Sequence, residues 1–187
     1  MAIICVDLDG VVCDFNSAYT KLLMKINPTI KVDYLAADFP TEWDWDKAIG
    51  FTYADREAAW TEIKHSGLFW RSLFPYPTAW EDLSTLYDLR KQHDIYFVTA
   101  RPGLTAKQES EEWLRGHGFP GATVIIAIEK ELIVNAVKAD CIIDDNPKNL
   151  LYQTNTKTIL FKRPYNKLYW NSFNQTVTTV REALDGL

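Results

Sequence analysis

Short runs rich in isoleucine and valine recur along the chain, and stretches with helical spacing lie between them. The runs are continuous rather than alternating, which is typical of parallel strands covered by helices on both faces. They span residues 3–6, 95–98, 123–128, 141–143 and 158–161. Helical patterns cover residues 78–92, 105–117, 130–138 and 176–185. Strand alternating with helix predicts the α/β class, as a doubly wound parallel sheet with right-handed crossovers and helices on both faces.

One long segment interrupts this alternation. Residues 15–80 contain no convincing strand, and their spacing predicts helices at about 15–26 and 54–66. This segment also holds most of the tryptophans, at positions 43, 45, 60, 70 and 80. We therefore expect a small helical cap, residues 15–80, inserted after the first strand and packed over the carboxyl edge of the sheet. Residues 1–14 and 81–187 would then form the core that carries the sheet.

Composition and charge narrow the class of protein. With 47% hydrophobic and 24% charged residues, a chain of 187 residues can bury a core, which excludes disorder for most of its length. Its net charge of −5 disfavours a protein that binds nucleic acid through a basic face. No apolar run approaches the roughly 18 residues of a membrane span. A strand-like start predicts no signal peptide, and three cysteines without a CxxC pair predict buried, reduced thiols in a cytoplasmic protein.

Acidic side chains follow two of the predicted strands. Asp7 and Asp9 are two residues apart, so a regular strand points both to one face, and Gly10 permits a turn directly after them. The strand at 141–143 runs into Asp144 and Asp145. An ordinary strand-end turn is the alternative interpretation. However, acids buried at a strand end repel one another unless a cation or a proton lies between them.

Two further strand ends supply complementary groups. Thr99 offers a hydroxyl, and Arg101 offers a guanidinium that can fork onto an oxyanion. Lys130 opens the helix after the third strand, although a lone lysine there is most often solvated. Because ligands of such sheets bind at the carboxyl ends of the strands, these groups are expected to converge on one crevice. Hard carboxylate oxygens predict Mg²⁺ there, whereas the scattered histidines and the missing GxxxxGK[ST] loop disfavour a zinc site and a P-loop.

Four segments together resemble the motifs of the haloacid dehalogenase-like superfamily, in order and over nearly the whole chain: DLDGV at 7–11, the VTAR run ending at 101, Lys130, and IIDDNPKN at 142–149. The resemblance implies that residues 1–14 and 81–187 form a Rossmann-like catalytic core, and that the reaction is phosphoryl transfer through an aspartyl-phosphate. Asp7 would be the nucleophile, and Asp9 would act first as general acid and then as general base. The resemblance also implies a phosphate-binding set of Thr99, Ala100, Arg101 and Lys130, and a magnesium-binding set of Asp7, the backbone carbonyl of Asp9, Asp144 and Asp145.

A narrower resemblance concerns the segments GLFWRSLFPYP at 67–77 and FKRPYNK at 161–167. Both are similar to segments of deoxyribonucleotidases that act on 5′ (and 3′) monophosphates. This implies a magnesium-dependent phosphoric monoester hydrolase of the 5′-nucleotidase type, acting on nucleoside and in particular deoxyribonucleoside monophosphates. Ala100 and Arg101 depart from the serine-type continuation of the animal enzymes. The long interval from Lys130 to Asp144 leaves Lys138 as a second candidate for the lysine.

We expect the cap to bind the leaving group of the substrate and to determine its specificity. Asp9 and Thr99 are 90 positions apart, so the room for a lid lies after the first strand. Aromatic rings suit a flat base, because stacking is worth about 1–3 kcal/mol per base. Phe69 and Trp70 are the leading candidates, followed by Trp43 and Trp45, although such rings equally form the core of a small cap.

Two alternatives remain open at this stage. One is a phosphatase of the same superfamily that acts on another small phosphomonoester or on a nucleic-acid 3′ phosphate. The other is a non-catalytic binding protein that keeps the fold. The sequence leaves open the base, the sugar, the position of the phosphate, the oligomeric state, and whether Asp144 or Asp145 binds the metal directly.

Overall fold

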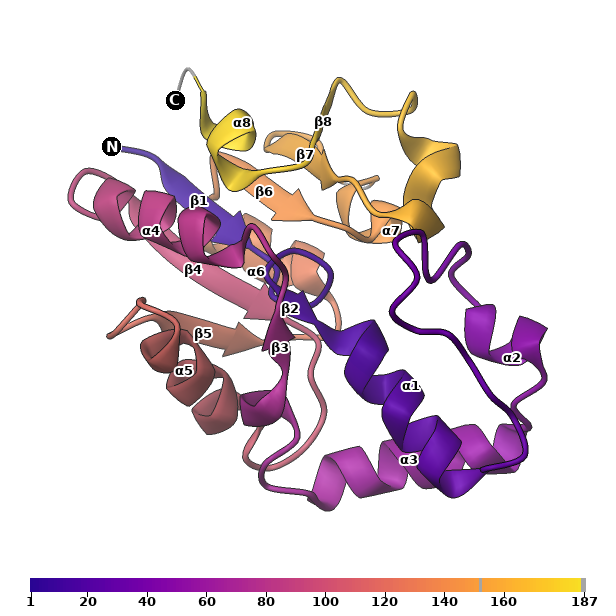
Figure 1. Ribbon diagram of the computed structural model, residues 1–187. Coiled ribbons are helices and arrows are strands. Elements are labelled where there is room, and N and C mark those ends of the chain that lie inside the picture. The colour runs from indigo at the N-terminus through magenta and orange to yellow at the C-terminus, as the bar shows by residue number, and fades with distance from the viewer. Residues whose placement is uncertain (152, 186–187) are drawn as a thin grey trace.

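The computed structural model describes residues 1–151 and 153–185. Its main sheet has six strands in the order β5-β4-β1-β6-β7-β8, and every neighbouring pair is parallel (Figure 1). The strands are β1 (Ile3–Val6), β4 (Asp94–Thr99), β5 (Thr123–Ile126), β6 (Cys141–Asp144), β7 (Lys157–Phe161) and β8 (Gln175–Val177). This confirms the predicted α/β fold. Residues 152, 186 and 187, which the expected core range included, lie outside the described residues.

Strand β1, inside the sheet, shows why the strand sequences are continuously apolar. Ile4 and Val6 pack into one core cluster and Cys5 into another, because successive side chains point to opposite faces. The first cluster is covered by α4 (Ala79–Leu89), α5 (Ala106–Gly116) and α8 (Val180–Leu184). The second is covered by α6 (Lys130–Val137) and α7 (Pro147–Leu150). Both faces of the sheet are therefore buried, as the sequence predicts.

The prediction of a helix at 176–185 is wrong in its first part. Residues Gln175–Val177 form β8 beside β7, and the helix begins only at Val180. The β-branched side chains of Thr176 and Val177 favour a strand. Thr179 then caps the helix, since its side chain accepts a hydrogen bond from the Glu182 backbone N–H.

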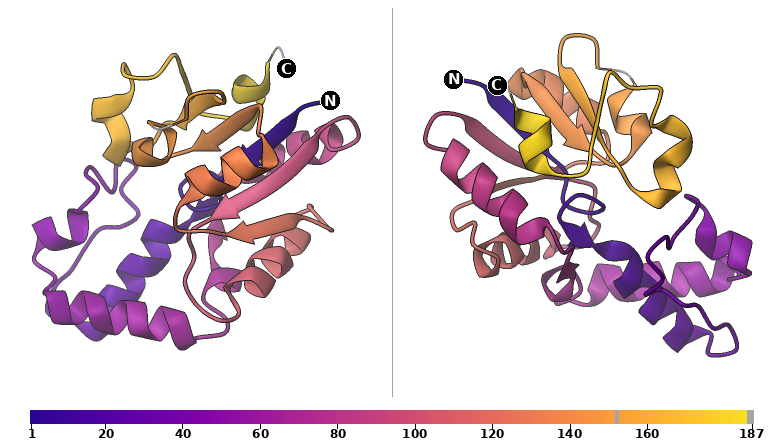
Figure 2. Two further views of the ribbon diagram at one scale, coloured as in Figure 1. Left: turned by 180° about the vertical axis from the view of Figure 1, so that it is seen from behind. Right: turned by 45° about the horizontal axis from the view of Figure 1, so that its top comes forward.

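The segment after β1 projects beyond the carboxyl ends of the strands, as both views in Figure 2 show. Its helices are α1 (Phe15–Ile26), α2 (Trp45–Ile49), α3 (Tyr53–His65) and a short 3-10 turn, η1 (Trp70–Ser72). The expected absence of strands here is wrong by one short ribbon. β2 (Cys13–Asp14) pairs antiparallel with β3 (Phe74–Pro75), where the chain leaves and re-enters the core. We propose that residues 15–80 act as a cap on the remaining core.

Aromatic rings form the interior of this cap. The Phe15 ring stacks on Tyr19 at 5.3 Å, on Trp60 at 5.7 Å and on Trp70 at 5.8 Å between centroids. Such pairs stabilise a small core beyond the area they bury. Among the described residues, no helix combines the length and the apolar character needed to cross a membrane.

Candidate active site

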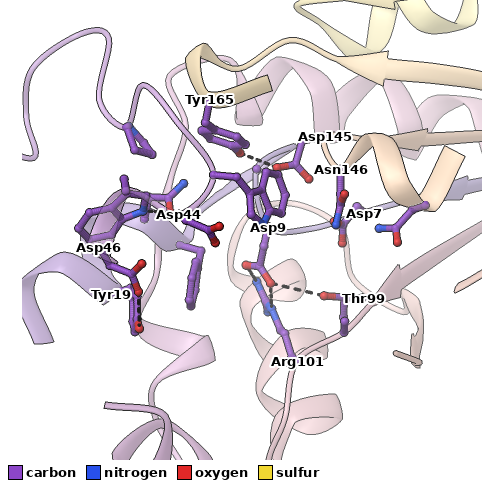
Figure 3. Close-up of a pocket in the computed structure, with 18 of the residues that line it drawn as sticks. Asp7, Asp9, Tyr19, Asp44, Asp46, Thr99, Arg101, Asp145, Asn146 and Tyr165 are labelled. Carbon is purple, nitrogen blue, oxygen red and sulfur yellow. Dashed lines mark hydrogen bonds and ion pairs between the residues drawn. The ribbon is translucent and has the colours of Figure 1, made fainter. Parts of the chain in front are cut away.

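A cavity of about 480 Å³ opens where β1, β4 and β6 end, between the sheet and the cap (Figure 3). The core contributes polar side chains to its wall: Asp7, Asp9, Thr99, Arg101, Lys130, Asp145, Asn146 and Tyr165. The cap contributes mainly aromatic and acidic ones: Tyr19, Glu42, Trp43, Asp44, Trp45, Asp46, Trp60 and Trp70. The predicted convergence of strand ends on one crevice is therefore what the structure contains.

The turn after β1 aims its acids into this cavity. The backbone N–H groups of Val11, Val12 and Cys13 all donate to the carbonyl of Leu8, at 3.3, 2.9 and 2.8 Å. Gly10 lies in the left-handed region with φ +80°. A Cβ at this position would overlap the Asp145 carboxylate and would lie 2.6 Å from the Tyr165 hydroxyl. Only glycine lets the loop pass so close to a second acid.

Lys130 joins the acids of β1 and β6. Its Nζ lies 2.7 Å from Asp7 Oδ2 and 2.7 Å from Asp144 Oδ2, and its side chain is almost fully buried. Burial lowers the pKa of Lys130, but Asp144 and Asp7 raise it by more, so the net pKa is raised and the lysine is held as a cation. The alternative, Lys138, is exposed at the far end of α6. Position 130 is therefore the one that reaches the nucleophile candidate.

The two acids after β6 have different surroundings. Asp144 is fully buried, and both its oxygens already accept protein hydrogen bonds: Oδ1 from the Asn146 N–H at 2.8 Å, and Oδ2 from Lys130 at 2.7 Å and Asn149 Nδ2 at 3.0 Å. Asp145 instead lines the cavity and accepts the Tyr165 hydroxyl at 2.5 Å. Of the pair, Asp145 is the acid with an oxygen toward the cavity.

The donor set fits a hard divalent cation. Asp7, Asp144 and Asp145 each offer a carboxylate oxygen, and these oxygens lie within 4.8 Å of one another. Burial raises the pKa of Asp7, and burial together with Asp144 raises the pKa of Asp145 to about 7. A bound cation would remove both penalties. Buried oxygens without a cysteine or histidine ligand suit Mg²⁺ better than zinc.

Arg101 is not placed as expected. Its Nε and Nη2 lie 2.9 and 2.8 Å from the two oxygens of Asp9, and its Nη1 donates to Ser110 Oγ at 2.9 Å (Figure 3). The expected fork onto a phosphoryl oxygen is thus a fork onto Asp9. Thr99 Oγ1 lies 3.4 Å from the same carboxylate, and Ala100 is exposed on the cavity wall.

The segment after β7 closes the side of the cavity that Asp145 and Gly10 line. Arg163 donates to the carbonyls of Gly10 and Val11 at 2.5 and 2.9 Å. The buried Asn166 amide donates to the carbonyls of Asp145 and Phe161 at 2.7 and 2.8 Å. These residues belong to the RPYN segment, residues 163–166, for which the sequence predicts no individual roles. Through these hydrogen bonds, the RPYN segment holds the loop after β1 and the loop after β6 in place.

The aromatic candidates differ in what they reach. Phe69 does not line the cavity; it packs edge-on against Phe15 and Trp70 inside the cap. Trp70 and Trp45 line the wall but are only 2% and 5% exposed. Trp43 is 48% exposed, lines the cavity, and packs edge-on against Tyr165 at 5.3 Å between centroids. Of the four predicted rings, Trp43 is therefore the most exposed one on the cavity wall, and Phe69 is the one that the wall does not include.

Polar cap residues face the same space. Tyr19 donates to Asp46 at 3.2 Å, and Asp46 adjoins the cavity with Asp44 (Figure 3). Burial and the nearby Asp46 charge raise the pKa of Tyr19, so the phenol stays protonated and remains a donor. The sequence does not predict that Tyr19, Asp44 and Asp46 line the cavity, because residue spacing does not show which face of a short helix or loop meets the core.

Comparison with known proteins identifies the architecture. The fold resembles a hydrolase of the haloacid dehalogenase-like family from Streptococcus pneumoniae, with 15% identity, a TM-score of 0.65, and coverage of 99% of this chain and 97% of that one. A structure named "Putative Phosphatase" from Clostridium difficile gives 14% identity, a TM-score of 0.66, and coverage of 98% and 97%. At this identity, the likeness establishes the fold.

Sequence relatives share part of the chain. A protein named "Putative nucleotidase" from Oceanobacillus iheyensis is 35% identical over 99 residues, which cover 49% of this chain and 51% of that protein. A "Putative nucleotidase" from Bacillus cereus is 30% identical over 116 residues, covering 61% and 58%. The chain thus spans little more than half the length of the curated relatives it matches.

A family model matches residues 1–177, which include every acid described above and the RPYN segment. Its fold is that of haloacid dehalogenase-like hydrolases, and the chain belongs to the family described as 5′ nucleotidase, deoxy (pyrimidine), cytosolic type C protein.

Proposed function

We propose that this protein is a magnesium-dependent phosphatase that hydrolyses deoxyribonucleoside monophosphates through an aspartyl-phosphate on Asp7. The observation that carries the proposal is the placement of Asp7. Its carboxylate lines the cavity 2.7 Å from Lys130, and Asp145 offers a second carboxylate oxygen beside it. A nucleophilic carboxylate, a fixed cation and a hard-metal site in one cleft are the parts that phosphoryl transfer needs.

Asp7, Asp145 and the backbone carbonyl of Asp9 would hold the metal. When bound, Mg²⁺ supplies positive charge that offsets the repulsion between the phosphate and the Asp7 carboxylate. Lys130 adds a second positive charge next to Asp7. Asp144 holds Lys130 in place rather than facing the cavity, because its oxygens are already taken by Lys130, Asn146 and Asn149.

The proposed reaction has two steps, in which Asp7 carries the phosphoryl group and Asp9 moves the proton. First, an Asp7 oxygen bonds to phosphorus while the ester oxygen leaves, and Asp9 gives its proton to the departing alkoxide. Second, Asp9 takes a proton from a water whose oxygen bonds to phosphorus. The bond from phosphorus to Asp7 then breaks, which releases inorganic phosphate and restores the carboxylate.

The nucleoside is proposed to occupy the cap side of the cavity. A volume of about 480 Å³ lies in the usual range for a small-molecule site, and Trp43 offers an exposed ring for a base. The family description names deoxy and pyrimidine nucleotides and a cytosolic location. We propose the same substrate class and the same location for this chain. Its cysteines Cys5, Cys13 and Cys141 are free and buried, and free thiols are typical of a reducing compartment.

The test is a substrate panel: deoxyribonucleoside 5′- and 3′-monophosphates, ribonucleotides, sugar phosphates and an aryl phosphate, each with Mg²⁺ and with excess chelator. We expect phosphate release from deoxyribonucleoside monophosphates only with the metal. Asp7→Asn should abolish turnover, because an amide cannot attack phosphorus. The matched control Asp88→Asn changes an exposed acid on α4 and should leave turnover unchanged.

Each outcome decides a different part of the proposal. Full activity under exhaustive chelation would overturn the metal. Preference for a sugar phosphate would overturn the substrate class, and failure with every ester would leave the non-catalytic alternative. A phosphoryl adduct trapped on any residue other than Asp7 would overturn the mechanism.

A further inference from the structure

Arg101 lies at the centre of a buried polar cluster beside the candidate acid–base. Its side chain is fully buried, whereas 22% of the Asp9 side chain remains exposed toward the cavity. Two of its nitrogens bind both oxygens of Asp9 at 2.8–2.9 Å, and the third binds Ser110 at 2.9 Å. All three guanidinium nitrogens are therefore engaged by the protein.

We propose that Arg101 is a positioning residue that orients the Asp9 carboxylate for proton transfer, and that it does not bind the phosphate. This inference rests on the proposed function, because it needs Asp9 to protonate a leaving group. A planar guanidinium fork fixes a carboxylate both in position and in the tilt of its plane. Each Asp9 oxygen keeps a further lone pair beyond the fork, and these lone pairs are the positions left for a proton or the substrate.

The side chains that hold Arg101 are themselves held by hydrogen bonds to the backbone. Ser110 donates in turn to the carbonyl of Ala106, at 2.7 Å, one turn earlier in α5. The face of Trp70 lies 4.9 Å from the guanidinium carbon, and the Trp70 indole N–H donates to the carbonyl of Pro102 at 3.0 Å. The buried Trp70 therefore supports the arginine from the cap side, which gives this ring a task other than base stacking.

The Arg101 guanidinium keeps its positive charge beside Asp9, which the fork requires. Burial lowers the pKa of Arg101, but Asp9 raises it by more, so the guanidinium stays charged in a site without direct solvent contact. Lysine has no second arm to bind the other oxygen of Asp9 and cannot reproduce this fork. The substitution Arg101→Lys thus keeps the charge and removes the orientation.

Leaving-group chemistry separates positioning from phosphate binding. A nucleoside departs as a basic alkoxide and needs the proton of Asp9, whereas a nitrophenolate departs without one. A residue that acts through Asp9 should therefore matter far more for the nucleotide than for the aryl phosphate. The informative parameter is kcat/KM, because it reports the steps up to transfer of the phosphoryl group and not the later hydrolysis of the intermediate.

The experiment compares Arg101→Lys, Ser110→Ala and the control Arg71→Lys. Arg71 lies in η1, is half-exposed, and pairs with Glu112 on α5, the helix that carries Ser110. We expect Arg101→Lys to lower kcat/KM for a deoxyribonucleoside monophosphate by roughly 10²-fold, within the range for loss of a general acid. The aryl phosphate should lose less than about tenfold, and the inhibition constant of inorganic phosphate should stay within about threefold. Ser110→Ala, which keeps Arg101, should show the same pattern more weakly.

A double-mutant cycle supplies the second readout. Once Asp9 is replaced by asparagine, Arg101→Lys should cost nothing further in kcat/KM, because its effect runs through Asp9. Equal losses for both substrates with weaker inhibition by phosphate would overturn the inference and make Arg101 a phosphate ligand. If Arg101→Lys fails to fold, Ser110→Ala decides between the same two outcomes. A wild-type protein inactive on all nucleotides would instead overturn the proposed function.

Discussion

Gly10 is the residue whose backbone most directly limits the site. Its φ of +80° is strained for any other residue, and an added methyl group would meet the buried carboxylate of Asp145. We expect Gly10→Ala to destabilise the fold by about 1–3 kcal/mol through backbone strain and to abolish the stabilisation that Mg²⁺ gives. Thermal unfolding with and without the metal measures both effects. Gly50→Ala is the control, because it also has positive φ but open space around it. A normal metal response in Gly10→Ala would contradict this reading.

The acids give the metal response a defined pH dependence. The pKa of Asp7 is raised in the folded protein, and that of Asp145 is raised to about 7. Folding therefore takes up protons between the ordinary aspartate pKa of about 4 and the raised values. Stability without metal should fall as pH rises through this window. Since Mg²⁺ needs ionised ligands, the increase in Tm that it gives should be larger at about pH 8 than at about pH 5.5.

Asp145→Asn is the control for this dependence. The variant loses one titrating ligand, so its metal-free stability should fall less between the two pH values, and its response to Mg²⁺ should be weak at both. An equal metal response of the wild type at both pH values would show that these acids do not gain the charge assigned to them.

At this scale, the sequence predicts which residues meet but not how they pair. Asp7, Asp9, Thr99, Lys130 and the two acids at 144–145 are found from their positions at strand ends. Whether Arg101 points at phosphate or at Asp9 depends on the direction its side chain takes after β4. Its partners in that direction are Ser110, nine positions away on α5, and Trp70 of the cap, and sequence spacing does not show that either one faces Arg101.

Asp82 joins two helices that lie on the same face of the sheet. It is buried on α4, and its Oδ1 accepts the Val180 N–H at 2.7 Å, at the first turn of α8. Its Oδ2 is buried without a protein partner among the described residues, and burial raises its pKa. The carboxylate is therefore useful as an acceptor and costly as a charge.

Two substitutions separate these contributions. Asp82→Ala leaves the Val180 N–H without an acceptor and should lower the free energy of unfolding by about 1–3 kcal/mol. Asp82→Asn keeps the acceptor and removes the charge, so near neutral pH it should match or exceed the wild type. Chemical denaturation measures both, and an asparagine variant as unstable as the alanine one would refute the argument.

Element boundaries follow from the same competition between local preference and packing. Helices α1, α3 and α6 begin and end within a residue or so of the ranges that periodicity predicts. The edge strand β8 was missed, because its three residues read locally as part of the following helix and are strand only through pairing with β7. The ribbon of β2 and β3 is equally invisible in sequence, since its two strands lie about 60 positions apart and are two residues long.

Over the whole molecule, the sequence predicts that the cap covers the crevice but not which ring faces it. In the cap, aromatic residues occur both in the interior and on the cavity wall, so residue type alone does not show where a ring lies. Phe69 and Trp70 precede the return to the sheet in the chain, yet the fold turns them inward against Phe15. Trp43 lies on the loop that reaches across to Tyr165 in the core. This pair joins an exposed tryptophan of the cap to a core side chain, and both line the cavity.

Trp43→Ala therefore tests whether cap and core share the substrate. Base–aromatic stacking is worth about 1–3 kcal/mol, and about 1.4 kcal/mol corresponds to a factor of ten. We expect KM for a deoxyribonucleoside monophosphate to rise roughly tenfold or more, while kcat/KM for a small aryl phosphate and the melting temperature stay nearly unchanged. Trp80→Ala, a tryptophan of similar exposure on α4 outside the cavity, should alter neither substrate. Equal losses on both substrates would mean that Trp43 only supports Tyr165, and through it Asp145, so that the cap stabilises the metal side of the site without reading the base.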